Sequence, residues 1–288
     1  MAVRRGVLTL FLALGAWAQG LYSPYAGAYL LPLRTLPGAE GAWAAFRGYL
    51  ANHLSYAQGD WGEMGFDLEE VRLEVGLGLR RGSWQAGVYL PFSLYYGGFL
   101  DYLLDPFHKA LALPYNREQG QVLLFARRGE EGRRWQGPVF GPRDPYLRLD
   151  GFLGPVRAFA ALAFPLGDPG RFLGSGGWRV LLGGGWAWEE GEAWLGATLP
   201  LGRQVGLEPF GEGPSLSALL RWEGPLKPFA VEAEGFWGPW WEAGPFAYGL
   251  ALRLRYGAFS FAEDLWGKLP DVVFSWEGVF PLPSVSSP

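Results

Sequence analysis

The sequence predicts an all-β protein, a transmembrane antiparallel β-barrel of about 14 strands with a short helix in one long loop. Three observations support this prediction. Long segments alternate large apolar residues with charged or small ones, the chain begins with an export-type segment, and charged residues make up only 18% of the sequence while aromatic residues reach 17%. Girdles at the two membrane interfaces would accommodate the 15 tryptophans.

The N-terminus has the pattern of a cleaved export signal. Arg4 and Arg5 precede an apolar run at 6–15, and Ala16 and Ala18 supply the small residues that a signal peptidase reads. The run is too short for a membrane-spanning helix, which needs roughly 20 residues. We therefore expect a signal peptide at 1–18, an N-terminal segment at 19–42, the barrel at 43–280 and a C-terminal tail at 281–288.

The clearest strand is predicted at 66–80, where leucines and valines alternate without a slip with charged residues and glycines. A second strand is expected at 83–94, after a short turn at Arg81 and Gly82. Both exceed the roughly 5–6 residues usual in globular proteins. The alternative, a soluble sandwich with polar outer faces, does not need strands of this length, so the pattern favours a membrane wall.

A late hairpin is predicted from the same alternation at 229–237 and 246–256. Opposite charges pair across neighbouring strands. In this hairpin Glu232 and Glu234 are therefore expected near Arg253 and Arg255, on the lumen face.

Ten further segments have strand character and bring the total to about 14. They are 43–56, 121–127, 134–140, 146–152, 155–164, 178–188, 192–199, 215–222, 258–265 and 271–280. Segment 134–140 contains Pro138, which cannot donate to a central ladder, so 12 strands is the alternative.

Three of the predicted strands end in similar short sequences: Leu-Pro-Phe at 90–92, Phe-Pro-Leu-Gly at 164–167 and Leu-Pro-Leu-Gly at 199–202. This similarity predicts that they end at the same membrane surface. The longer connections would then share that side, as is usual for the outer side of a barrel. These connections are 57–65, 95–120, 166–176 and 201–213.

Composition excludes several kinds of site. The chain has no cysteine and a net charge of −4, which excludes disulfides and thiolate metal sites and gives no basic patch for nucleic acid. The two histidines lie in distant segments without metal-ligand spacing, so we expect no metal and no cofactor. The expected partners are outer-membrane lipids and the barrel-assembly machinery; oligomeric state is left open.

His53 and Ser55 are two positions apart on a predicted strand and share a face. This spacing resembles that of outer-membrane lipid hydrolases, in which a neighbouring polar residue orients the histidine; Asp67 or Glu69 would be that residue here. The opposite face of the strand is more apolar, which turns the pair toward the lumen. A hydrogen-bonded lumen histidine is therefore favoured over catalysis.

The segment 95–120 is the longest predicted loop. Its leucines recur at helical spacing, and Asp101 and His108 lie near one side of that helix, followed by Arg117. Such a loop can fold into the barrel mouth as a plug or cover its rim as a lid. Both arrangements remain open.

Four patches resemble the DUF3187 family of bacterial proteins: Asn-His-Leu-Ser-Tyr at 52–56, the acidic stretch 67–70, Gly-Gly-Phe-Leu-Asp at 97–101 with Phe107-His108 and Leu113-Pro114, and Phe-Ala-Glu-Asp-Leu at 261–265. The resemblance implies an outer-membrane barrel and no particular activity. The chain departs from the usual barrel in one respect, because the tail 281–288 follows the terminal aromatic Phe280.

These observations predict a bacterial outer-membrane barrel that serves as a passive or gated conduit for small or lipophilic solutes. A lipid hydrolase using His53 and Ser55, or a closed structural barrel, are the alternatives. The groups expected to line or gate the lumen are Glu70, Arg72, Glu74, Asp101, His108, Arg117, Glu232, Glu234, Arg253 and Arg255.

Overall fold

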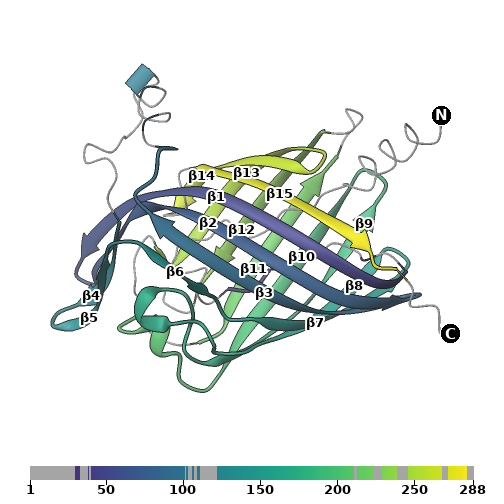
Figure 1. Ribbon diagram of the computed structural model, residues 1–288, viewed down its shortest axis with the longest axis horizontal. Helices are drawn as coiled ribbons and strands as arrows, with labels where there is room; N and C mark the ends of the chain where they lie inside the picture. The colour runs from purple at the N-terminus through teal and green to yellow at the C-terminus, as the bar shows by residue number, and fades with distance from the viewer. Residues whose placement is uncertain are drawn as a thin grey trace.

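In the computed structural model, the chain forms a closed antiparallel β-barrel (Figure 1). The structure describes residues 30–32, 38, 40–100, 102, 106, 109–110, 122–210, 213–223, 229–238, 246–267 and 272–283. Among these residues, no helix has the length and apolar character needed to cross a bilayer.

Twelve of the 15 strands form the wall, which closes where the first strand pairs with the last, from Trp43 opposite Pro281 to Asn52 opposite Val272. The wall strands are β1 (Gly41–Gly59), β2 (Gly62–Arg81), β3 (Trp84–Tyr96), β7 (Tyr146–Leu153), β8 (Val156–Ala163), β9 (Trp178–Trp188), β10 (Gly191–Leu201), β11 (Ser215–Trp222), β12 (Phe229–Trp237), β13 (Tyr248–Tyr256), β14 (Phe259–Gly267) and β15 (Val272–Pro281).

The remaining strands are β4 (Leu123–Arg128), β5 (Glu131–Gln136) and β6 (Val139–Pro142), and they lie outside the ring. The prediction of about 14 wall strands is therefore wrong, and the alternative of 12 is confirmed. Strand β2 is 20 residues long and extends beyond the part that pairs with β3. Strand β4 of the β4–β5 hairpin pairs with this remaining end of β2, Glu63–Asp67. Pro138 separates β5 from β6, and β6 pairs with β3 next to the segment that pairs with β7.

The long connections share one end of the barrel, as the three similar strand ends predict. The sequences at 164–167 and 199–202 lie at the ends of β8 and β10, whereas Leu-Pro-Phe at 90–92 lies inside β3, which continues to Tyr96. These strands are the third, fifth and seventh of the wall, so all three run in the same direction. The predicted strands 121–127 and 134–140 both lie outside the wall. Because two strands are lost from the count, the later wall strands keep their predicted directions. The expected connection at 57–65 is mostly strand, with a turn at Asp60 and Trp61.

The other end carries short turns between β2 and β3 and between β13 and β14. Gly82 and Gly257 occupy the first turn position there with φ of 54° and 57°. Primed hairpin turns need this positive φ, which glycine adopts without strain.

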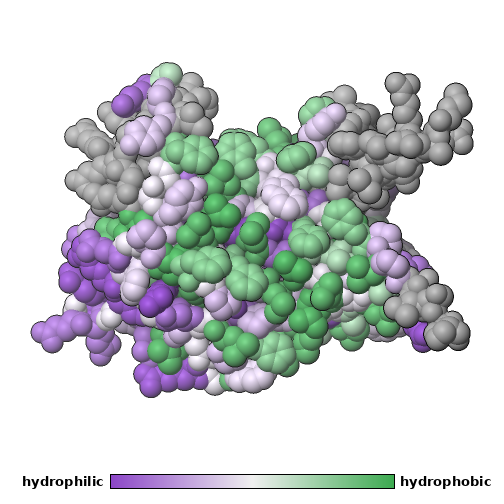
Figure 2. Space-filling view, viewed as in Figure 1, coloured by the Kyte–Doolittle hydropathy of each residue, from purple (hydrophilic) through white to green (hydrophobic). Residues whose placement is uncertain are grey.

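The wall has an apolar exterior and a polar interior. On β2 the side chains of Leu73, Leu77 and Leu79 are about half exposed, whereas those of Glu70 and Glu74 are buried. Figure 2 shows apolar side chains spread over the middle of the visible wall, and hydrophilic ones gathered over β4 and β5 at its left end. This arrangement, inverted relative to a soluble protein, is that of a transmembrane barrel.

Candidate functional site in the barrel lumen

An ionic cluster on β1, β2 and β15 occupies the lumen. Arg47 forms an ion pair with Glu74, and its Nε lies 3.3 Å from Glu277 Oε2. The Tyr146 hydroxyl donates to Glu74 Oε2 at 3.1 Å and also lies 3.4 Å from Arg47 Nη1. All four side chains are buried. Since charges removed from water are costly unless paired, these contacts fix each group in place.

A second cluster is centred on Glu70 of β2. Its carboxylate accepts from Ser93 Oγ at 2.6 Å, from Arg72 Nε at 2.9 Å and from Arg143 Nη1 at 3.0 Å. The His53 ring nitrogen Nε2 lies 3.1 Å from the other carboxylate oxygen. One glutamate therefore joins side chains from β1, β2, β3 and the connection between β6 and β7.

A third cluster surrounds Glu232 of β12, and it contains the cross-strand charges expected from the sequence. Glu232 lies 2.7 Å from Arg253 and 3.2 Å from Arg255, and Arg253 also contacts Glu234 at 3.2 Å. Arg221 of β11 adds a further contact to Glu232 at 3.3 Å. Arg255 lies 3.4 Å from Glu277, which joins this cluster to the Arg47 cluster across β15.

Residues 30–32 and Gly38, which precede the first strand, lie inside the barrel. Arg148 of β7 donates a hydrogen bond to the Pro32 carbonyl. Leu30 and Leu31 are each 4% exposed and belong to two different buried apolar clusters of the lumen. Near the short-turn end, Gly38 donates to Gln85 and accepts from Arg80. These described residues thus occupy lumen space before β1 begins.

The lumen cluster at the long-loop end contains Leu30 and a group of aromatic side chains. Phe172 follows the short helix η1 (Pro169–Arg171), and Phe210 lies three residues after η2 (Val205–Leu207); both are fully buried. Phe66 of β2 and Phe246 pack edge to face with 5.6 Å between ring centroids. The two connections therefore fold inward and fill the mouth.

Asp144 anchors the first of these connections. Its carboxylate accepts from the backbone N–H groups of Gly167 at 2.8 Å and Ser175 at 2.9 Å, and lies 3.0 Å from Arg179 of β9. A single buried carboxylate therefore ties both ends of the loop to the wall.

The second apolar cluster is rich in aromatic residues and includes Leu31. Tyr89 stacks on Tyr146 with centroids 4.8 Å apart, and Trp43 lies tilted against Tyr89 at 6.1 Å. A Cβ at Gly78 or Gly87 would collide with the Trp43 indole. Glycines on the lumen face therefore make room for these rings.

The residues proposed for hydrolysis do not assemble into a catalytic group. His53 and Ser55 both face the lumen and are buried, but the His53 contact is to Glu70. Asp67 lies opposite Leu54 in the register, on the other face of the wall. It cannot orient His53 from there. Among the described residues, no group of three or more His, Asp or Glu side chains is placed to hold a metal ion.

The gating residues predicted in the loop 95–120 lie outside the described residues: Asp101, His108 and Arg117. Leu100 N donates to Glu69, whose side chain is on the outer face of β2. Leu100, Tyr102, Pro106, Lys109 and Ala110 have helical backbone geometry, and the residues between them are not described. The loop helix and its gating role stay predictions.

Sequence reasoning named the segment 19–42 without placing Pro32 in the lumen, and it missed Arg143 and Asp144. No periodicity marks them, because they lie in irregular segments. Arg148 and Arg221 carried a signal, since each alternates with outward leucines on β7 and β11.

No family model matches the chain, and no curated protein matches it. Among solved structures, it is similar to an outer membrane channel from Pseudomonas putida F1, with 15% identity and a TM-score of 0.47 over 86% of this chain and 98% of that one. It is also similar to OmpF of Salmonella typhi in complex with daunomycin (7% identity, TM-score 0.32, 83% and 97% covered). A third similar structure is the Salmonella typhi outer membrane phospholipase dimer with bound calcium (10% identity, TM-score 0.36, 94% and 96% covered).

Proposed function

We propose that this protein is a gated conduit for small or lipophilic solutes in the bacterial outer membrane, closed in the described state by its own N-terminal segment and outer loops. One observation carries the proposal: segments that do not belong to the wall bury apolar side chains in the interior. Leu30 and Leu31 come from the N-terminal segment, and Phe172 and Phe210 come from connections between wall strands.

Barrel geometry explains why this filling matters. About eight strands enclose a space that wall side chains can fill, and the diameter grows with strand number. A wall of 12 strands leaves additional room. Because the filling segments are not part of the wall ladder, they can leave without breaking its hydrogen bonds.

The charged clusters define what an opened lumen would offer a solute. Their glutamates and arginines nearly balance, which favours weak ion selectivity. Apolar clusters accompany them in the lumen. This mixture suits small or partly lipophilic solutes better than a single class of ion. The proposed lining groups are Glu70, Arg72, Glu74, Glu232, Glu234, Arg253 and Arg255.

Two alternatives are weaker. A lipid hydrolase would need His53 to activate the Ser55 hydroxyl, whereas the His53 ring contacts Glu70 and faces the lumen. A closed structural barrel would not need a filling made of separable segments. Membership of the DUF3187 family remains a prediction from the sequence patches, as does export by a cleaved signal.

Planar-bilayer recordings test the proposal. The refolded protein should give small, intermittent currents, and a variant lacking residues 19–38 should give steady conductance several-fold larger. Absence of current from both would favour the closed structural barrel. Phospholipid hydrolysis by the wild-type protein that is lost in Ser55→Ala would favour the enzyme instead.

A further inference from the structure

The β4–β5 hairpin extends the outer surface of β1 and β2 at the long-loop end. In the register, Tyr56 lies opposite Gly65, Gly65 opposite Phe125, and Phe125 opposite Arg134. Arg127 lies opposite Glu63 one step further along the same face. Because side chains alternate along each strand, these residues share one surface.

The apolar part of this surface continues the lipid-facing wall. Phe46 and Tyr56 are both exposed on the outward face of β1, and the Tyr56 side chain is 55% exposed. The Tyr56 and Phe125 rings contact each other with centroids 5.9 Å apart. Aromatic side chains at the end of an apolar wall typically lie where hydrocarbon meets headgroups.

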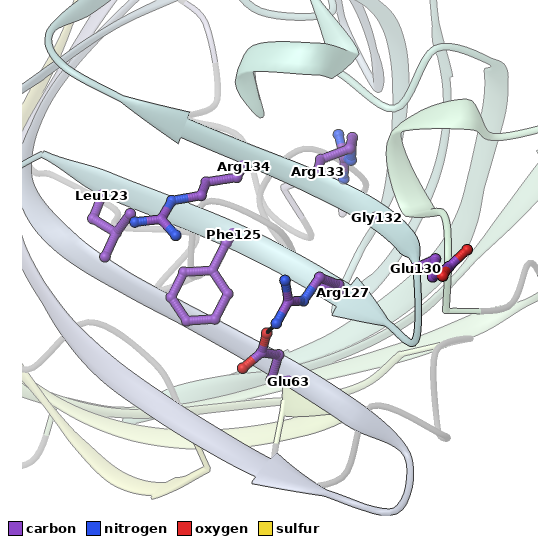
Figure 3. Close-up of a pocket in the computed structure, with 8 residues that line it drawn as sticks. All are labelled: Glu63, Leu123, Phe125, Arg127, Glu130, Gly132, Arg133 and Arg134. Atoms are coloured by element: carbon purple, nitrogen blue, oxygen red, sulfur yellow. Dashed lines mark ion pairs between the residues drawn. The ribbon is translucent and has the colours of Figure 1, made fainter.

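The charged part of the surface lies just beyond these rings, in a hollow of about 300 Å³. Figure 3 shows Phe125 between the side chains of Arg127 and Arg134. Arg127 is 60% exposed and pairs with Glu63 at 2.5 Å. Arg134 is exposed and forms no ion pair with any described residue.

Arg133 has a different role on the opposite face of the hairpin. It donates to the carbonyls of Pro169 and Gly206, in the two inward-folded connections. Its guanidinium also lies 4.3 Å from the Phe172 ring centroid. These contacts hold the hairpin against the barrel, so the arginines of its outer face are presented from a fixed position.

We propose that this hollow binds a phosphate-bearing lipid headgroup of the outer leaflet. Guanidinium groups match phosphate oxygens with paired, charge-assisted hydrogen bonds, and Arg134 offers such donors. Tyr56 and Phe125 would contact the adjoining hydrocarbon. The long-loop end is the outer end of a bacterial barrel. The inference rests on the proposed membrane orientation but not on conduction, so lipid binding and conductance are separate measurements.

Native mass spectrometry of the full-length protein in neutral detergent, titrated with diphosphoryl lipid A, tests the proposal. Arg134→Gln should weaken binding, and R127Q combined with R134Q should raise the apparent Kd by at least about tenfold, equivalent to about 1.4 kcal/mol. Heat-modifiable electrophoretic migration verifies that each variant retains the barrel.

Arg128→Gln is the matched control, because Arg128 is exposed on the same hairpin but alternates to the other face. It removes one positive charge, as Arg134→Gln does, and should leave the Kd for lipid A unchanged. A loss of binding in R128Q equal to that of the double variant would overturn the site. So would unchanged binding in the double variant. Inorganic phosphate binding as tightly as lipid A would show a free-anion site and refute the lipid assignment.

Discussion

Arg148 of β7 donates a hydrogen bond to the carbonyl of Pro32, which lies 116 positions earlier in the chain. The same guanidinium contacts Asp150 at 2.8 Å and lies over the Phe159 ring at 4.3 Å. A wall residue thus holds Pro32 in the lumen and itself contacts two neighbours. This contact is the most direct place to test closure.

Loss of the Arg148 contact should loosen the N-terminal segment. Arg148→Met combined with Asp150→Asn removes the donor without leaving an unpaired buried carboxylate. We expect more frequent opening in single-channel recordings and faster proteolysis of the N-terminal segment. Asp150→Asn alone, which keeps the Pro32 contact, is the control. Identical behaviour of the two variants would contradict the role of Arg148.

The Glu70 cluster should contribute strongly to stability. Glu70→Gln leaves Arg72 and Arg143 without their shared carboxylate, and breaking a buried pair typically costs about 3–5 kcal/mol. Urea unfolding in lipid vesicles measures this change. Adding Arg143→Gln removes one uncompensated charge and should recover part of the loss, since groups in one network are not additive. Strictly additive losses would mean that the two residues do not interact.

The aromatic filling of the mouth should restrict current. Phe172→Ala with Phe210→Ala removes two fully buried rings from the inward-folded connections. We expect conductance to rise several-fold, and to rise further when residues 19–38 are also deleted. Phe140→Ala is the control, because that ring is 71% exposed outside the lumen. An equal rise in the control would place the constriction elsewhere.

The outward face of β2 should tolerate no charge at mid-depth. Leu73→Arg should lower the free energy of unfolding by about 2–4 kcal/mol, whereas an arginine near the interface costs roughly 0–1 kcal/mol. Leu201→Arg, at the exposed end of β10, is the interfacial comparison. Urea midpoints in vesicles measure both. Equal shifts would show that the wall is not embedded at the proposed depth.

Export should remove the first 18 residues. Ala16 and Ala18 provide the small side chains required at the cleavage site, so intact-mass analysis of the membrane fraction should find a chain beginning at Gln19. A mature protein that retains Arg4 and Arg5 would refute cleavage, and Ala18→Arg should block it in a parallel culture.

Alternation along single strands was enough to predict the wall and its two faces. Alternation is a local property, so Leu73 outside and Glu74 inside follow from the order of residues on one strand. The Glu232–Arg253 pair follows in the same way, because a hairpin brings its two strands into a nearby register. No distant part of the chain is needed for either inference.

The strand count, the closure of the barrel and the contents of the lumen depend on long-range contacts that become visible in the fold. Period 2 shows that 121–127 is a strand but not that it pairs with the free end of β2 instead of entering the wall. Arg143 meets Glu70, and Pro32 meets Arg148, across separations of 73 and 116 positions from segments without any period. Such contacts depend on which surfaces remain unfilled once the barrel has closed, and the local order of residues does not encode that.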